Sequence, residues 1–160
     1  MLKKIIFPGT FNPFTIGHLD VAKRAAGLFD RLIIAVTEET SKPGVLPARD
    51  RAALIGKCVG ELPNVEVKTF NGLLVEFCKK ENARLVVRGI RSFNDFQYEN
   101  TMLFVNKKLA PEIETLYMMA SQEYGDVSGS AVRDLIRLKA DISAFVPPEI
   151  KDDLLRLYER

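Results

Sequence analysis

A short segment near the start of the chain brings together residue types that could bind a phosphate group. An apolar run at residues 5–7 leads into a loop rich in glycine, threonine and proline, which ends at His18, the only histidine of the sequence. Residues 19–29 then have the pattern of an amphipathic helix, so His18 is expected at a helix start. The first turn of a helix exposes unpaired N–H groups and the positive end of the dipole, which attract anions. A histidine at this place can contact a phosphate that the helix binds.

Two later segments offer further groups for an anion. Arg88 ends an apolar run, and the planar fork of a guanidinium matches two phosphate oxygens, although a structural ion pair is the alternative. Residues 128–130, with the sequence Ser-Gly-Ser, precede another amphipathic segment. Serine and glycine at such a place either cap the helix or form a cradle for a phosphate.

Strand-like runs alternate with helical patterns along the chain. The runs expected to form strands are residues 3–7, 31–36, 65–70, 84–88 and 115–119. The segments expected to form helices are residues 17–29, 48–62, 73–81, 95–109 and 129–138, with a last helix beginning at Pro147 and Pro148. This alternation predicts an α/β fold, a Rossmann-like parallel sheet of five strands with helices on both faces.

The order of the strands decides where a ligand can bind. For this fold class we expect the order 3-2-1-4-5, in which the first and fourth strands are neighbours at the point where the order reverses. Ligands of such sheets bind outside the carboxyl ends of the strands at that point. The loops that follow these two strands contain residues 9–11 and 89–91, so topology and motif predict the same site.

The composition limits the classes of function. A chain of 160 residues with ordinary apolar content is expected to form one domain over residues 1–160. Its net charge of +2 argues against general binding to nucleic acid or to a membrane, and we expect neither a membrane span nor a signal peptide. Cys58 and Cys78 fall in separate predicted helices, which favours core thiols in a reducing cytoplasm over a structural zinc site.

Three motifs resemble those of the nucleotidyltransferase superfamily. Residues 15–18, TIGH, are similar to its T/H-x-G-H signature, and residues 127–133, VSGSAVR, to its late I-S-S-S/T-x-x-R motif. Residues 88–99, RGIRSFNDFQYE, resemble the R-G-x-R…D-F-x-Y-E block of one branch, the bacterial-type phosphopantetheine adenylyltransferases of coenzyme A biosynthesis. Asn12 stands where that family usually has aspartate, and Gly129 where it usually has serine, which removes one charge and one hydroxyl.

The resemblance implies transfer of AMP from ATP to 4′-phosphopantetheine, giving dephospho-coenzyme A and pyrophosphate. The attacking group is then a phosphate monoester, whose second pKa of about 6 leaves it largely ionised without a general base. The protein would act by positioning and by offsetting the repulsion between two phosphorylated substrates. We therefore do not expect Asp95 and Glu99, one helical turn apart, to form an acid–base pair, and Asp95 is expected to cap the helix or orient an arginine.

The resemblance also implies roles for individual residues, with His18 contacting the α-phosphate and stabilising the transition state. The implied catalytic residues are Thr10, His18, Lys42, Arg91 and Ser130. The implied ATP-binding residues are Gly9, Thr10, Phe11, Gly17, His18, Gly89, Ile90, Arg91, Glu99, Tyr124, Gly125, Asp126, Val127, Ser128, Gly129 and Ser130. The implied phosphopantetheine-binding residues are Thr10, Lys42, Leu74 and Arg88. Mg²⁺ would arrive with ATP, and we expect no residue to bind the metal directly.

The family further implies a homohexamer in the cytoplasm, with coenzyme A as a feedback inhibitor. Two other functions stay open at this point. Another small nucleotidyltransferase, acting on glycerol 3-phosphate or nicotinamide mononucleotide, would share the TIGH signature but not the block at residues 88–99. A non-catalytic nucleotide-binding module on the same fold would not need His18, Lys42 and Arg91 directed at a leaving pyrophosphate.

Overall fold

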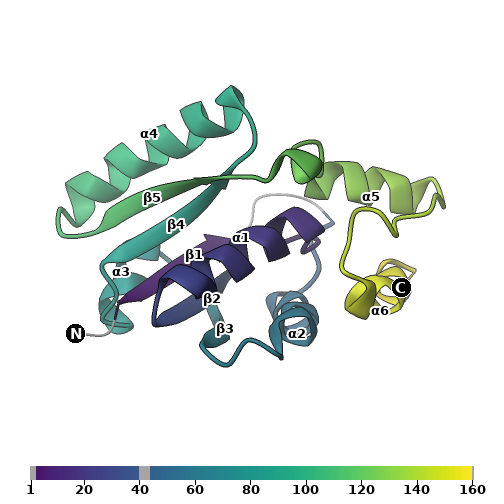
Figure 1. Cartoon of the computed structure of the whole chain (residues 1–160), viewed down its shortest axis with the longest axis horizontal. Coiled ribbons are helices and arrows are strands. Elements are labelled where there is room, and N and C mark those ends of the chain that lie inside the picture. The colour runs from purple at the N-terminus through teal and green to yellow at the C-terminus, as the bar shows by residue number, and fades with distance from the viewer. Residues whose placement is uncertain (1–2, 40–43, 160) are drawn as a thin grey trace.

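The computed structural model describes residues 3–39 and 44–159, and it contains one parallel sheet of five strands in the order β3-β2-β1-β4-β5 (Figure 1). The strands are β1 Lys4–Gly9, β2 Arg31–Thr37, β3 Val65–Phe70, β4 Leu85–Ile90 and β5 Glu114–Met119. The fold class and the strand order expected from the sequence are confirmed. The first strand continues to Gly9, so the glycine-rich loop starts two residues later than expected.

The helices follow the predicted alternation. They are α1 Ile16–Leu28, α2 Ala48–Val59, α3 Leu74–Lys80, α4 Phe93–Leu109, α5 Gly129–Arg137 and α6 Lys151–Tyr158, with short 3₁₀ turns at Gln122–Tyr124 and Pro148–Ile150. Helix α4 begins two residues earlier than predicted, because the hydroxyl of Ser92 caps it by accepting a hydrogen bond from the Asp95 N–H. The last helix is a 3₁₀ turn at the prolines, which α6 then continues.

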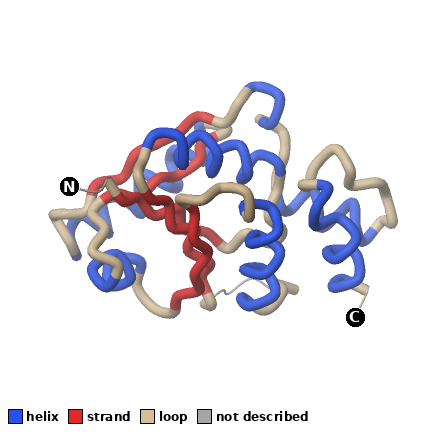
Figure 2. Tube along the Cα trace, turned by 60° about the horizontal axis from the view of Figure 1, so that its bottom comes forward, coloured by secondary structure: helices blue, strands red, loops and turns tan. Residues whose placement is uncertain are grey.

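Helices lie on both sides of the strands (Figure 2). Alternate residues of the central strands face two separate hydrophobic clusters. Ile5, Leu32 and Ile34 point to one side, where they pack with residues of α1, α2, α5 and α6. Ile6 and Ile33 point to the other side, where α3 supplies most of the covering residues. All five side chains are fully buried, so β1 and β2 form the rigid centre from which the carboxyl-end loops project.

Strands β1 and β4 are neighbours, but they pair over only a short stretch. β1 pairs with β2 over six residue pairs, whereas its pairing with β4 has only two, Ile5 with Leu85 and Ile6 with Val86. Beyond these pairs the two strands separate toward their carboxyl ends. The sheet therefore opens a crevice at the reversal of strand order, which is where the sequence predicts the ligand site.

Exposed apolar side chains gather on the two elements at the β5 edge of the sheet. Helix α4 lies along β5 (Figure 1), and none of its residues is buried. We define the α4–β5 face by its exposed apolar residues, which are Phe93, Phe96, Tyr98, Met102, Phe104, Val105 and Leu109 of α4 and Leu116 and Met119 of β5. None of the helices in residues 3–39 and 44–159 combines the length and the apolar character that a membrane crossing needs.

The packing predicts that two leucines contribute very differently to the free energy of unfolding. Leu32 is fully buried in β2, whereas Leu28, at the end of α1, is 68% exposed. We expect Leu32→Ala to lower the free energy of unfolding by about 2–5 kcal/mol, because it removes buried methyl groups and leaves a cavity. The matched control, Leu28→Ala, should change it by less than about 0.5 kcal/mol. Urea unfolding monitored by circular dichroism measures both, and equal effects would contradict this description of the core.

Candidate active site

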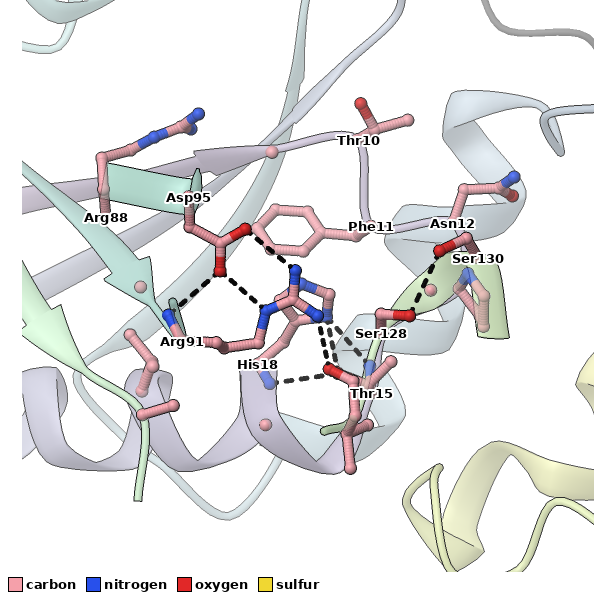
Figure 3. Close-up of a pocket in the computed structure, with 18 of the residues that line it drawn as sticks. Thr10, Phe11, Asn12, Thr15, His18, Arg88, Arg91, Asp95, Ser128 and Ser130 are labelled. Carbon is pink, nitrogen blue, oxygen red and sulfur yellow. Dashed lines mark hydrogen bonds and ion pairs between the residues drawn. The ribbon is translucent and has the colours of Figure 1, made fainter. Parts of the chain in front are cut away.

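A pocket of about 490 Å³ occupies the crevice between β1 and β4. Its walls are the loop after β1, the first turn of α1, the end of β4, the first turns of α4 and the start of α5. Figure 3 shows side chains from these segments directed toward one another. Segments that are far apart in the sequence, such as residues 9–18 and 127–133, thus meet in one place.

The loop after β1 is held in an unusual backbone conformation. Phe11 has φ = 50° and its ring is 4% exposed, so a bulky side chain occupies the left-handed region that most residues avoid. The ring lies against Gly9, where an added Cβ would come within 2.8 Å of the Phe11 ring. Gly9 is therefore required by close packing, and the strained Phe11 backbone marks this loop as a functional element.

His18 is fixed by a reciprocal hydrogen-bond arrangement with Thr15, which caps α1. The Thr15 hydroxyl accepts a hydrogen bond from the His18 N–H at 3.3 Å, and the Thr15 N–H donates to His18 Nδ1 at 3.0 Å. Because Nδ1 accepts a hydrogen bond, the proton of the neutral ring is on Nε2. The ring therefore offers one N–H donor, at the edge away from Thr15 (Figure 3).

The pKa of His18 is lowered from 6.5 to about 4, first by burial and then by the positive charges of Arg91 and Arg88. The ring packs among aromatic side chains, stacked on Phe14 at 5.6 Å between centroids and edge-on to Phe11 at 5.1 Å. His18 is therefore neutral at pH 7. The ring therefore offers a neutral hydrogen-bond donor, and the positive charge of the pocket comes from arginine.

Two helix N-termini face the pocket. Gly17 belongs to the first turn of α1, and Gly129 and Ser130 begin α5, where Ser128 caps the helix by accepting from the Ala131 N–H at 3.1 Å. Within the described parts of the chain, the N–H groups of Gly17, Gly129 and Ser130 have no hydrogen-bond acceptor. Uncapped N–H groups at two helix starts form an anion-binding surface. Ser128 thus gives the cap that the sequence left as one alternative, and the phosphate cradle stays a prediction.

Arg88 crosses the gap between the separating strands. Its Nη1 donates to the carbonyl of Pro8 at 2.6 Å, which links the end of β4 to the end of β1. Its Nε and Nη2 donate to the two carboxylate oxygens of Glu99, each at 2.6 Å. The structural ion pair considered from the sequence is therefore present, and both partners also line the pocket.

Arg91 is oriented by Asp95. Its Nε and Nη2 donate to the Asp95 carboxylate at 3.0 and 3.2 Å, and Nη1 donates to the carbonyl of Val127 at 2.8 Å (Figure 3). The expectation that Asp95 orients an arginine is confirmed, while Ser92 is the residue that caps α4. Arg91 thereby connects the loop after β4 to the late serine-containing loop.

Gly129 lies against the loop after β1. An added Cβ at Gly129 would come within 3.1 Å of the Asn12 carbonyl oxygen, which also accepts a hydrogen bond from Arg133 Nη1 at 2.5 Å. The Asn12 side chain accepts from the Leu46 N–H at 3.2 Å and from the Tyr158 hydroxyl at 3.0 Å. Asn12 therefore joins the pocket to the entry of α2 and to the C-terminal helix.

Most of the residues predicted from the sequence meet in the pocket. Those that line it are Gly9, Thr10, Phe11, Gly17, His18, Arg88, Gly89, Arg91, Glu99, Val127, Ser128, Gly129 and Ser130. Lys42 lies outside the described residues.

Five predicted residues are placed away from the pocket lining. Ile90 is buried at the end of β4, and Leu74 begins α3 and packs against the cluster on the far side of the sheet. Tyr124 lies at the rim, where an added Cβ at Gly17 would be 3.6 Å from its Cβ, and Gly125 and Asp126 are exposed in the following loop. Their contacts with substrate stay predictions.

Sequence reasoning gave no role to several residues that line the pocket, among them Thr15, Asn94, Tyr98 and Arg133. A signal existed for two of them. Thr15 precedes His18 by three residues, which is the spacing of a capping box. Arg133 follows Gly129 by four residues, so both lie on the same side of α5.

Comparison with known proteins agrees with this geometry. Residues 6–135 match the family described as Cytidylyltransferase-like. A phosphopantetheine adenylyltransferase of Clostridium perfringens is 45% identical over 149 residues, covering 93% of this chain and 91% of the relative. A phosphopantetheine adenylyltransferase of Staphylococcus haemolyticus is 44% identical over 157 residues, covering 98% of each chain.

The fold is also similar to a solved structure of low sequence identity. The nicotinic acid mononucleotide adenylyltransferase of Plasmodium falciparum, solved in complex with NaAD, superposes with a TM-score of 0.76 over 99% of this chain and 98% of that chain, at 12% identity. This likeness concerns the fold alone. Because the family match and the two relatives span nearly the whole chain, the chain belongs to the Cytidylyltransferase-like family and, within it, to the phosphopantetheine adenylyltransferases.

Proposed function

We propose that this protein transfers AMP from ATP to 4′-phosphopantetheine. An oxygen of the phosphopantetheine phosphate attacks the α-phosphorus of ATP, the bond from that phosphorus to the bridging oxygen of the β-phosphate breaks, and pyrophosphate leaves with the electron pair. The products are dephospho-coenzyme A and pyrophosphate. The observation that supports this most is the convergence of two uncapped helix N-termini, a neutral His18 and two oriented arginines on one crevice.

The acid groups of the pocket support a mechanism without a general base. Glu99 binds Arg88 through both carboxylate oxygens, and Asp95 binds Arg91 in the same way. Neither carboxylate is therefore available to remove a proton. The attacking phosphate needs no such help, because it is largely ionised at neutral pH. Catalysis then depends on alignment of the two substrates and on stabilisation of the charge that develops at the α-phosphate.

In this proposal His18 donates from Nε2 to an α-phosphate oxygen, and the N–H groups at the starts of α1 and α5 contact the nucleotide phosphates. Thr10 and Ser130 add hydroxyl donors, and Arg91 binds the phosphates that leave as pyrophosphate. Lys42, which the resemblance assigns to the phosphopantetheine phosphate, would complete the set.

Arg88 is the proposed ligand of the phosphopantetheine phosphate. Glu99 and the Pro8 carbonyl fix its guanidinium at the mouth of the gap between β1 and β4. The pocket is lined by three arginines, Arg88, Arg91 and Arg133, and by two carboxylates, Asp95 and Glu99. The carboxylates therefore limit the net charge of the pocket before substrate binds. Glu99 is thus proposed to orient Arg88 as well as to contact the nucleotide.

Magnesium is proposed to enter as part of the substrate Mg-ATP. Among the residues described by the structure, no group of three or more His, Cys, Asp or Glu side chains is arranged to hold a metal ion. Mg²⁺ commonly keeps several waters and binds through substrate phosphates, so it does not require such a group.

The assembly and its setting are proposed from the family, from one exposed apolar surface and from two free cysteines. A homohexamer would cover the α4–β5 face, whose Phe93, Phe104 and Met119 are each more than half exposed. Coenzyme A would act as a feedback inhibitor, because it carries the same pantetheine arm and an adenine nucleotide. A cytoplasmic location is supported by Cys58 and Cys78, which are free thiols with pKa values raised by burial to about 12 and about 11.

Pyrophosphate release tests the reaction. We expect release with Mg-ATP and 4′-phosphopantetheine and none with glycerol 3-phosphate and CTP, or with nicotinamide mononucleotide and ATP. Turnover in only one of the other mixtures would show that the protein acts on the substrate of that mixture and not on phosphopantetheine. ATP binding without pyrophosphate release in any mixture would indicate a non-catalytic binding module.

His18→Ala should lower kcat by about 10²- to 10³-fold, because the variant loses a donor directed at the transition state. The KM for ATP should change much less, since the helix N-termini still bind the phosphates. Steady-state kinetics with each substrate varied separately measures the two effects. A loss confined to KM would show that His18 contributes only uniform binding.

The depressed pKa of His18 predicts how stability depends on pH. The unfolded chain takes up a proton near pH 6.5 and the folded protein only near pH 4, so stability is complete above 6.5 and is lost as the pH falls through this window. Between pH 7.5 and pH 5 the parent should lose about 2 kcal/mol more unfolding free energy than His18→Gln, which lacks the titrating group. Urea unfolding at the two pH values measures the difference, and identical losses would contradict a buried neutral ring.

The oligomer proposal predicts that a charge on the α4–β5 face separates the subunits. Phe104→Asp, at a position that is 59% exposed, should shift the protein to a smaller species in sedimentation velocity. The control Leu28→Asp introduces the same charge at a leucine that is 68% exposed on α1, and it should leave the assembly intact. A monomeric parent protein, or equal effects of the two variants, would reject the proposed interface.

A further inference from the structure

We infer that Arg51 is a positioning residue for adenylyl transfer, which holds the Thr10 peptide and the neighbouring pocket wall in the arrangement that binds ATP. Arg51 lies on α2, is only 2% exposed and is among the largest side chains that the fold buries completely. It does not line the pocket. The inference rests on the proposed function, because Arg51 would hold the loop that binds substrate without contacting the substrate itself.

The guanidinium of Arg51 joins three segments that are distant in the sequence. Its Nη1 donates to the Thr10 carbonyl at 2.5 Å, its Nη2 to the Thr37 carbonyl at 2.8 Å, and its Nε to the Leu46 carbonyl at 2.7 Å. These carbonyls belong to the loop after β1, to the end of β2 and to the chain just before α2. A planar fork with fixed donor directions sets the relative positions of all three.

The pairing of Arg51 is unusual for a buried charge. In residues 3–39 and 44–159 no carboxylate forms an ion pair with it, and its acceptors are backbone carbonyls. Burial lowers the pKa of the guanidinium from its ordinary value. Burying an ion without a counter-charge is costly, and the three carbonyl acceptors offset part of that cost. What the Arg51 fork adds is a fixed geometry for the three segments that carry those carbonyls.

The Thr10 peptide connects this geometry to the reaction. In a trans peptide the C=O and the following N–H point in opposite directions. Since the Thr10 carbonyl points to Arg51, the N–H of Phe11 points away from it, and no acceptor within the described residues binds that N–H. Thr10 and Phe11 both line the pocket, as does Val45, next to Leu46. Arg51 therefore fixes the backbone N–H of Phe11, a residue that the resemblance assigns to ATP, and the peptide that carries Thr10.

The test compares Arg51→Lys, which keeps the charge but loses the fork, with Arg49→Lys on the same helix, where the arginine side chain is 87% exposed. At a temperature where thermal melts show full folding, Arg51→Lys should lower kcat/KM for ATP by about 10²-fold, the effect of a misplaced reacting group. Arg49→Lys should match the parent. Guanidinium ion, but not methylammonium, should restore part of the rate of Arg51→Ala.

Three results would overturn the inference. Arg51→Lys could have the same kcat/KM as the parent, or its loss of kcat/KM could vanish after correction for the folded fraction. Arg51→Lys could also fail to fold, which would make Arg51 a structural residue. Binding of an ATP analogue with a non-cleavable α,β bond, measured by calorimetry, separates this inference from the proposed function. If phosphopantetheine proves not to be the substrate, a roughly tenfold weaker analogue affinity in Arg51→Lys still supports the role of Arg51, and unchanged affinity rejects it.

Discussion

The separation of β1 from β4 is the constraint on which the site depends. β2 holds β1 along six residue pairs, and β4 holds it along two. The short pairing leaves backbone groups at the carboxyl ends of both strands without a ladder partner, so side chains must satisfy them. Arg88 does so for Pro8, and the loops and helix starts around the crevice have their N–H groups turned to the same space. An opening in a parallel sheet thus becomes a place where donors outnumber acceptors, which is what a chain of phosphates requires.

The electrostatics of the pocket are more balanced than its arginines suggest. Glu99 and Asp95 each hold an arginine, and His18 is kept neutral by burial and by those same arginines. The resting protein therefore does not carry a large cluster of unpaired charge at this edge. Directed but uncharged donors, namely the His18 ring and the helix N–H groups, are proposed to supply much of the attraction for phosphate. Such donors are already oriented before the substrate arrives, so little reorganisation accompanies binding.

The sequence predicts the fold and the centre of the site well, because both depend on local patterns. Alternating apolar runs determine the strands, and the reversal of their order follows from the fold class. His18 could be placed at a helix start because the loop before it and the helical pattern after it both lie within ten residues of it in the sequence. Arg51 could not be recognised in this way, since a helical arginine is usually on the surface and its acceptors come from three loops separated in the chain. The position of Leu74 on the far side of the sheet likewise depends on tertiary packing.

The contact between Gly129 and Asn12 limits the size of the residue that can begin α5. Only 3.1 Å separates the Asn12 carbonyl oxygen from the place of a Cβ on residue 129. A side chain at 129 presses on the same carbonyl that Arg133 binds. That oxygen belongs to the backbone, so the crowding is the same whichever side chain stands at position 12. A residue larger than glycine at 129 is therefore accommodated only if the loop after β1 shifts by a few tenths of an ångström, and that loop forms a wall of the pocket.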